Sequence, residues 1–316
     1  MKSIIIVALL FALANVSTIN AKEQKTVLIT GASSGLGLRM TQVLSANGFL
    51  VYAGVYKQED VDRLEAMDNV EAVQFDVTNA EQIANAVDVI EAKGRGLYGL
   101  INNAGVAVFG PMIEVGVEHL HYQMDVNVYG PYRVSQAFAP LIIKSKGRIA
   151  TTGSIAGINS ESIFGLYAMS KHAVEAFTEA LSQELARFDV LVGVIEPGNH
   201  ASQIGNNTLK YLYDTRYWPE KTQYPQARKN TIKTLEMVTQ AADPQKVADA
   251  ALHFMSSERP NTRYLVTSTE EESEFTIRAS LSKALQLNHG HAYSYDEATL
   301  IKMLKEEAEK LNFDTP

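Results

Sequence analysis

Short apolar strands alternate with amphipathic helices along most of this chain, and this alternation restricts its possible folds more than any other feature. Parallel strands need long crossover connections, usually helices, and strands of a sheet covered on both faces are apolar throughout. The pattern therefore predicts a doubly wound α/β fold with a parallel sheet, the Rossmann arrangement. Strands are predicted at residues 26–30, 49–55, 70–75, 99–101, 148–152, 190–195 and 263–266.

A single domain is predicted over residues 22–295, because no repeat, low-complexity tract or long linker divides the chain. The 316 residues, 46% of them hydrophobic, are enough to bury a full core. Residues 200–229 interrupt the alternation and are expected to form a lid or insertion. Residues 296–316 are predicted to be a C-terminal amphipathic helix and tail.

The N-terminus has the pattern of a targeting segment. Lys2 precedes an uncharged run, and small and polar residues follow up to Ala21. This predicts a signal peptide over residues 1–21, with an uncleaved anchor or a buried N-terminal element as the alternatives. We therefore expect an exported or membrane-associated protein, with residues 4–16 as the part that would associate with a membrane.

Charge and composition exclude several classes of function. Lys and Arg number 28 against 36 Asp and Glu, and a net charge of -8 gives no attraction to the phosphates of a nucleic acid. The chain has no cysteine, which removes disulfides, thiolate metal sites and a cysteine nucleophile. The pair His289 and His291 is interpreted as a solvated loop, so no metal site is predicted.

The first motif, Thr30-Gly31-Ala32-Ser33-Ser34-Gly35-Leu36-Gly37, joins the first strand to the first helix. Glycines let the backbone approach a pyrophosphate, and the amides that begin a helix attract an anion. The same residues match the Gly-x-Ser-x-Gly elbow of α/β hydrolases. In that fold several strands precede the elbow, whereas here only one does, so the hydrolase is a remote alternative.

A second constellation surrounds the end of the fifth predicted strand. Ser154 follows that strand, and Tyr167 and Lys171 begin the next helix four residues apart, on one face. An ammonium beside a phenol stabilises the phenolate, so we expect Lys171 to lower the tyrosine pKa from about 10. Tyr217 and Lys221 match the same spacing, but the intervening Pro219 is incompatible with a helix.

Further motifs follow the other predicted strands. Asn102-Asn103-Ala104-Gly105 comes after the fourth strand and Pro197-Gly198 after the sixth. Because parallel strands end at one edge of the sheet, where such sheets bind ligands, these motifs are expected to form one site.

These motifs together resemble the short-chain dehydrogenase/reductase family over residues 25–270. The resemblance implies an NAD(P)-dependent oxidoreductase that interconverts a secondary alcohol and a ketone, or an alcohol and an aldehyde. It implies Asn127, Ser154, Tyr167 and Lys171 as the catalytic residues. It further implies dinucleotide contacts from Gly31, Ser33, Ser34, Gly35, Leu36, Gly37, Tyr56, Lys57, Asp76, Val77, Asn103, Ala104, Gly105, Tyr167, Lys171, Pro197, Gly198 and Ser202.

The resemblance also implies a homodimer or homotetramer. Within the family, residues 51–55 and the Ile195-Glu196-Pro197-Gly198 motif are most similar to the retinol and hydroxysteroid dehydrogenase branch. A nucleotide-binding sensor or scaffold without catalysis is the alternative function.

The cofactor choice between NAD and NADP depends on the end of the second strand. An acidic residue there would bind the 2′-hydroxyl of NAD, and a basic one the 2′-phosphate of NADP. Val55 and Tyr56 are neither, but Lys57 follows and favours NADP.

The substrate prediction depends on aromatic residues near the insertion. Tyr211, Tyr213, Tyr217, Trp218 and Tyr224 lie within it, and Phe109, Met112, Ile155 and Phe164 lie near the predicted site. They suggest an apolar pocket for a lipophilic substrate of steroid or retinoid type. Alternatively, these aromatic residues pack the lid on the core or on a second subunit.

Overall fold

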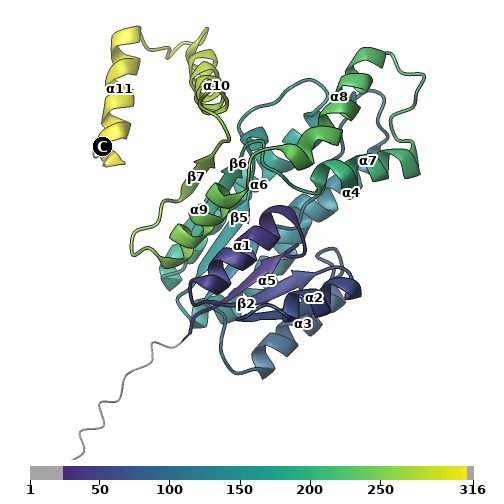
Figure 1. Cartoon of the computed structure of the whole chain (residues 1–316). Helices are drawn as coiled ribbons and strands as arrows, with labels where there is room; N and C mark the ends of the chain where they lie inside the picture. The colour runs from purple at the N-terminus through teal and green to yellow at the C-terminus, as the bar shows by residue number, and fades with distance from the viewer. Residues whose placement is uncertain (1–23, 312–316) are drawn as a thin grey trace, which may run out of the picture.

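The computed structural model describes residues 24–311 and has seven strands in one parallel sheet (Figure 1). The predicted signal segment, residues 1–21, lies outside the described residues. The strands follow the order β3-β2-β1-β4-β5-β6-β7, so the doubly wound fold is confirmed. The strands are β1 (Thr26–Thr30), β2 (Leu50–Val55), β3 (Val70–Gln74), β4 (Gly99–Asn102), β5 (Arg148–Thr152), β6 (Leu191–Pro197) and β7 (Arg263–Val266).

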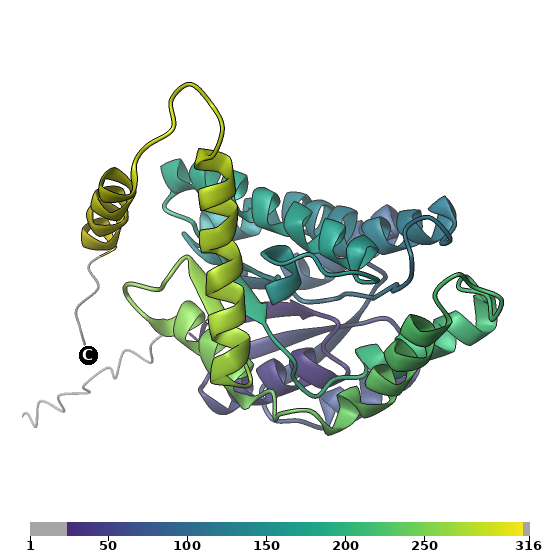
Figure 2. The same cartoon turned by 90° about the horizontal axis from the view of Figure 1, so that it is seen from above.

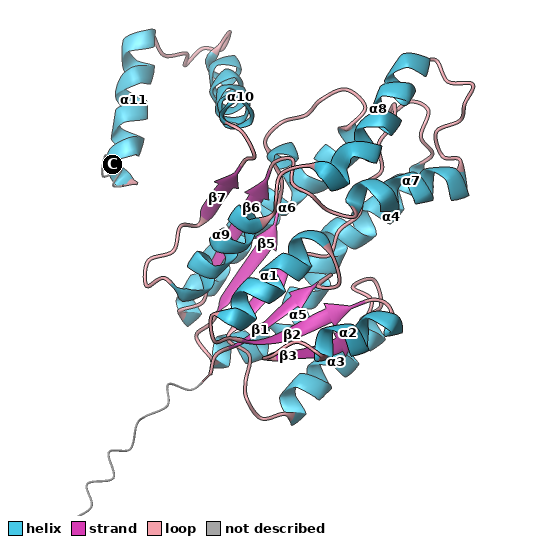
Figure 3. Cartoon of the chain, viewed as in Figure 1, coloured by secondary structure: helices cyan, strands magenta, loops and turns pink. Residues whose placement is uncertain are grey.

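Helices connect successive strands (Figure 3). A π-helical turn, η2 (Asp125–Tyr129), separates α4 from α5, and a 3-10 turn, η3 (Ile155–Gly157), follows β5. The α-helices are α1 (Gly35–Ala46), α2 (Val61–Glu65), α3 (Ala80–Ala92), α4 (Val117–Met124), α5 (Gly130–Lys144), α6 (Gly165–Leu185), α7 (Ile204–Thr215), α8 (Pro225–Met237), α9 (Gln245–Ser256), α10 (Glu270–Asn288) and α11 (Glu297–Lys310).

Each face of the sheet carries its own apolar core, with helices on both sides (Figure 2). On one face, Met40 of α1 and Phe254 of α9 pack on alternate strand residues such as Ile29. On the other, Ile83 of α3 and Phe138 of α5 pack on the intervening residues. Because successive strand side chains point to opposite faces, burial of both faces explains the nearly continuous apolar strands.

The strand order reverses beside β1, which pairs with both β2 and β4. The connections that leave β1 and β4 therefore diverge to opposite faces and leave a crevice at the carboxyl ends of these strands. The ends of β5 and β6 lie along the same edge, because Thr152 is in register with Ile195. The fold thereby gathers the predicted motifs at one edge of the sheet.

The predicted lid or insertion, residues 200–229, contains α7, the loop after it and the start of α8, and this pair of helices projects from one end of the molecule (Figure 1). Tyr217 and Lys221 lie in the loop between α7 and α8, so they do not share a helical face. The predicted C-terminal helix corresponds to α11, which lies beyond α10 and away from the sheet (Figure 2). Among the residues described, none of the helices is both long and apolar enough to span a membrane.

Candidate active site

A cavity of about 900 Å³ lies at the carboxyl ends of the strands. Its walls come from the turn after β1, the ends of β2 to β6, the start of α6, and α7 and α8. A cavity of this size falls within the range that ligand pockets occupy.

The turn between β1 and α1 is shaped as a cradle for an anion. Gly31 and Gly35 have φ angles of +65° and +52°, which side chains rarely adopt. A Cβ on Gly37 would lie 2.2 Å from the carbonyl oxygen of Gly31. Ser34 makes no side-chain cap to α1, so the amides of the first helical turn are available to a ligand. The residues present therefore fit a dinucleotide pyrophosphate.

Polar side chains hold the neighbouring strand ends in place. The Thr30 hydroxyl accepts hydrogen bonds from the backbone amides of Asn103 (2.9 Å) and Ala104 (3.0 Å). The side-chain amide of Asn103 donates to the Thr30 carbonyl at 3.0 Å. These bonds fix β4 against the glycine turn. After β3, Asp76 accepts hydrogen bonds from the amide and hydroxyl of Thr78, both at 2.8 Å, and orders that edge of the cavity.

Ser154, Tyr167 and Lys171 meet on one wall of the cavity. The Ser154 hydroxyl accepts from the amide of Ala156 at 3.1 Å and so holds its place at the start of η3. On α6, the Lys171 Nζ lies 5.7 Å from the centre of the Tyr167 ring. It donates to the Thr152 carbonyl at 2.8 Å, which ties the lysine to the end of β5.

Burial dominates the proton affinities of this pair. It raises the pKa of Tyr167 to about 12, although the Ser154 hydroxyl acts in the opposite direction. It lowers the pKa of Lys171 to about 8, opposed by the charge of Glu175. The expectation that Lys171 gives Tyr167 a lowered pKa is therefore wrong for this structure. Burial favours the neutral phenol, and the ammonium is directed at a backbone carbonyl.

Asn127 lies in the π-helical turn η2, behind the cavity wall. Its side chain accepts from the amide of Val106 at 2.8 Å and donates to the Val106 carbonyl at 2.9 Å. It also donates to the Ser170 hydroxyl at 3.1 Å, between Tyr167 and Lys171 on α6. The residue thus joins the segment after β4 to the helix that carries the Tyr–Lys pair.

Comparison with known proteins fits this geometry. A family model described as short chain dehydrogenase matches residues 25–211. The chain belongs to the short-chain dehydrogenase family. It is therefore an NAD(P)-dependent oxidoreductase, and the family assignment does not favour the scaffold or the hydrolase.

Two curated relatives and one solved structure illustrate the similarity. The mitochondrial D-beta-hydroxybutyrate dehydrogenase of Bos taurus is 32% identical over 78% of this chain and 78% of its own. Retinol dehydrogenase 7 of Rattus norvegicus is 33% identical over 77% of this chain and 80% of its own. A short chain dehydrogenase from Burkholderia cenocepacia, solved in complex with NADP, is 26% identical with a TM-score of 0.64, over 84% of this chain and 96% of its own.

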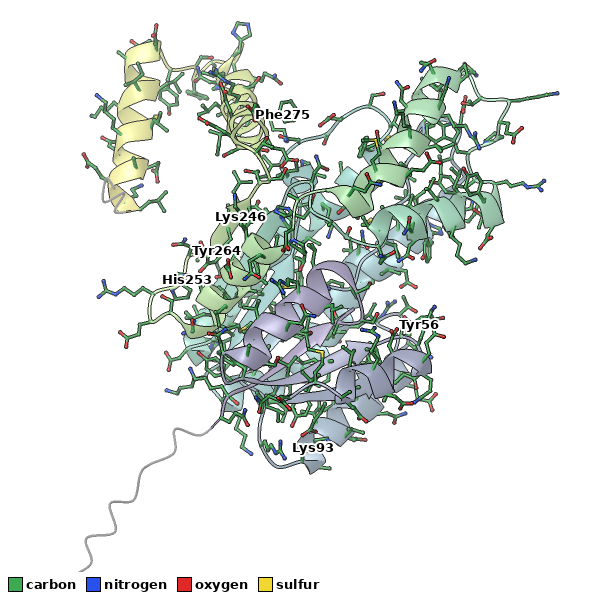
Figure 4. All side chains as sticks on the ribbon, viewed as in Figure 1. Tyr56, Lys93, Lys246, His253, Tyr264 and Phe275 are labelled. Carbon is green, nitrogen blue, oxygen red and sulfur yellow. The ribbon has the colours of Figure 1, made fainter. Side chains whose placement is uncertain are left out.

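Most of the site residues predicted from the sequence line the cavity. Asn127 and Lys57 do not: Asn127 lies behind the wall, and Lys57 is exposed with its Nζ 3.0 Å from a Glu59 carboxylate oxygen. Tyr56 lines the cavity edge but is 69% exposed, at the outer edge of the molecule (Figure 4). The predicted residues that line the cavity are Gly31, Ser33, Ser34, Gly35, Leu36, Gly37, Tyr56, Asp76, Val77, Asn103, Ala104, Gly105, Ser154, Tyr167, Lys171, Pro197, Gly198 and Ser202.

Three residues beside the site were not predicted from the sequence. Arg63 donates to the Ser33 carbonyl in the glycine turn at 2.7 Å. Glu272 of α10 accepts from the amide of Asn199 at 2.9 Å, next to Pro197-Gly198. His200 lines the cavity and is buried. Arg63 and Glu272 reach the site from 30 and 73 residues away, so no local pattern could have indicated them.

The prediction of an apolar pocket lined by these aromatic residues is only partly correct. None of the five aromatic residues of the insertion is among the described residues that line the cavity. Trp218 and Tyr217 are instead buried in a separate cluster with Leu166 and Val108, and Tyr211 stacks on Tyr122. These rings hold the insertion on the core, as the alternative interpretation expected. Of the other candidates, Phe109, Ile155 and Phe164 line the cavity and Met112 does not.

Proposed function

We propose that this enzyme interconverts a neutral, lipophilic alcohol and its carbonyl compound, either a secondary alcohol and ketone of steroid type or a primary alcohol and aldehyde of retinoid type. The observation that carries the proposal is the apolar wall beside Tyr167. The rings of Phe109 and Phe164 lie 4.4 Å apart between centroids, and Phe109 lies 5.6 Å from the Tyr167 ring. Ile155, Ile204, Leu235 and Val238 also line this part of the cavity.

The charges of the cavity support a neutral substrate. Among the described residues that line it, Lys171 is the sole lysine or arginine, and Asp76, Asp125 and Glu161 are acidic. A hydroxy-acid substrate needs a cation for its carboxylate. The Lys171 Nζ donates to the Thr152 carbonyl, and in the proposed site its other donors would bind the ribose of the dinucleotide. The site therefore favours a retinol-type over a hydroxybutyrate-type substrate.

The reacting groups follow from the geometry. Tyr167 keeps its proton at neutral pH and donates it to the carbonyl oxygen of the substrate, and the Ser154 hydroxyl donates a hydrogen bond to the same oxygen. Lys171 holds positive charge beside the phenol and binds the ribose of the dinucleotide. Asn127 acts as a positioning residue through Val106 and Ser170. The dinucleotide, when bound along the glycine turn, supplies or accepts the hydride.

A substrate panel tests the proposed class. Residues 22–316 are assayed with NADPH against a steroid ketone, all-trans-retinal and acetoacetate, and with NADP against the matching alcohols. We expect kcat/KM for the lipophilic pair to exceed that for acetoacetate at least tenfold, because only the apolar substrates bury surface on this wall. Equal or better turnover of acetoacetate would disprove the lipophilic assignment.

For the cofactor, we propose a preference for NADP. The residue that supports this preference is Arg63 and not Lys57. Its guanidinium contacts the glycine turn beside Ser33 and Ser34, both of which line the cavity. It is also paired with Asp60 at 2.5 Å, which fixes its direction. A planar guanidinium suits the bidentate recognition of a phosphate.

Arg63→Ala is therefore expected to raise the Kd for NADPH about tenfold, the loss of one charge-assisted contact. The Kd for NADH should change little. Fluorescence titration of both nucleotides measures the difference, and Arg278→Ala on α10, also an arginine with a carboxylate partner, is the control. An equal loss for both nucleotides would show that Arg63 only supports the turn.

We also propose a homodimer or homotetramer with membrane association through residues 4–16. Exposed apolar side chains on the outer helices support an association of subunits, among them Phe275 of α10 (Figure 4) and Leu304 of α11, which are 49% and 59% exposed. Light scattering on residues 22–316, and flotation of the full chain with lipid vesicles, test the two parts separately.

A further inference from the structure

Two buried glutamates and an arginine lie directly behind the Tyr–Lys pair. Glu175 follows Lys171 by one turn of α6, Glu196 lies on β6, and Arg263 lies on β7. The Arg263 Nη1 donates to Glu175 at 2.6 Å and also to Glu196. The Glu196 side chain is 0% exposed and that of Glu175 is 12% exposed.

The arrangement leaves one oxygen of each carboxyl group without a donor. Within residues 24–311, the Glu175 Oε1 and the Glu196 Oε2 are buried and have no hydrogen-bond partner. Two ionised carboxylates cannot form a hydrogen bond with each other, because both are acceptors, and an unpaired buried charge destabilises the fold. Burial raises the pKa of Glu196, and the two side chains lie close enough that a hydrogen bond between them raises it further. The proton in that bond would remove one of the two negative charges.

The glutamate pair also borders the catalytic loop. A Cβ on Gly153 or Gly157 would lie 2.9 or 2.8 Å from the Glu175 Oε1, so glycines on both sides of Ser154 make room for this carboxyl group. The charged and titratable groups around the pair are Lys171 and Glu179 on α6 and Arg263 on β7. Glu179 binds the Arg263 Nη2 at 3.0 Å but is 65% exposed.

We propose that Glu175 and Glu196 share one proton near neutral pH and release it as the pH rises, and that the added negative charge then keeps Lys171 protonated. The two glutamates are positioning residues, because they act on Lys171 and do not touch the substrate. The relevance to catalysis rests on the role proposed for Lys171, but the shared proton itself does not.

The direction of each effect follows from the charges. Burial, together with the charge of Glu175, raises the pKa of Glu196 to about 7, and Arg263 opposes this. Burial lowers the pKa of Lys171 to about 8, and Glu175 opposes this. The pair therefore gains its second negative charge just below the pH at which Lys171 would lose its proton. Removing either carboxylate should make that proton easier to lose.

The test measures the protonation of Lys171 without a substrate. Residues 22–316 carrying ¹³C-lysine are titrated by NMR through the Cε signals, and the Lys171 signal is identified by its absence from K171M. Glu175→Gln and Glu196→Gln should each lower the Lys171 midpoint by about one pH unit. Glu179→Gln is the matched control: it removes a carboxylate that binds the same arginine in solvent, and it should leave the midpoint unchanged. Unchanged midpoints in both buried variants would overturn the proposal.

Infrared difference spectroscopy on the wild-type protein provides a test that does not depend on how the variants fold. Between pH 6 and pH 9 we expect one buried protonated carboxyl band to disappear, because exposed carboxyl groups are already ionised at pH 6. No such band at pH 6 would disprove the shared proton. A loss of activity in K171M tests the catalytic role of Lys171 separately.

Discussion

Tyr167→Phe is expected to reduce turnover about a thousandfold while leaving NADPH binding unchanged. The substitution removes only the hydroxyl that gives its proton to the carbonyl oxygen, and the ring keeps its contact with Phe109. Steady-state kinetics with the preferred carbonyl substrate of the panel measures kcat, and nucleotide fluorescence measures the NADPH Kd. Retained turnover would refute the assignment of Tyr167 as the acid.

The chain supplies a matched control in its second Tyr-x-x-x-Lys motif. Tyr217 is also buried, and burial raises its pKa to about 12. Within residues 24–311, however, its hydroxyl takes part in one hydrogen bond, which it accepts from the backbone amide of Phe109 at 3.3 Å. Tyr217→Phe should therefore lower the free energy of unfolding by about 1 kcal/mol, the value of one hydrogen bond, and leave kcat nearly unchanged.

Gly37→Ala is expected to abolish dinucleotide binding. The new Cβ would lie 2.2 Å from the Gly31 carbonyl oxygen and 2.6 Å from the Asn103 Nδ2, so the turn and the end of β4 must move apart. The free energy of unfolding should fall by about 3 kcal/mol, as for other overpacked sites. NADPH titration and urea unfolding measure the two effects.

Gly116→Ala is the control for Gly37→Ala. Gly116 has an ordinary φ of −63°, and the atoms nearest a new Cβ belong to the carboxylate of Glu118, which is 71% exposed and free to move. Because Gly116 is the N-cap of α4, where alanine is less favourable than glycine, the effect of the substitution on stability should stay within about 1 kcal/mol. NADPH binding by Gly37→Ala at wild-type affinity would mean that the glycine turn does not hold the dinucleotide.

The parallel sheet and the motifs at its carboxyl edge could be predicted from the sequence, and most of the predicted site residues line the cavity. Strands β1, β5 and β7 have the predicted bounds, because apolar runs and turn residues are local signals. The motifs that follow the strands lie close together, as predicted, because parallel strands end at the same edge of the sheet. Tyr167 and Lys171 were recognisable from their spacing on one helix.

Which groups those residues face depends on contacts between elements that are far apart in the sequence. Lys57 pairs with Glu59, whereas Arg63 contacts the glycine turn, and the rings of Tyr217 and Trp218 pack the lid against Val108 and Leu166 of the core. The raised tyrosine pKa comes from burial, which depends on all the surrounding elements. Arg263 meets Glu175 and Glu196 across 88 and 67 residues. Contacts of that separation, and the burial that sets proton affinities, exist only once the chain has folded.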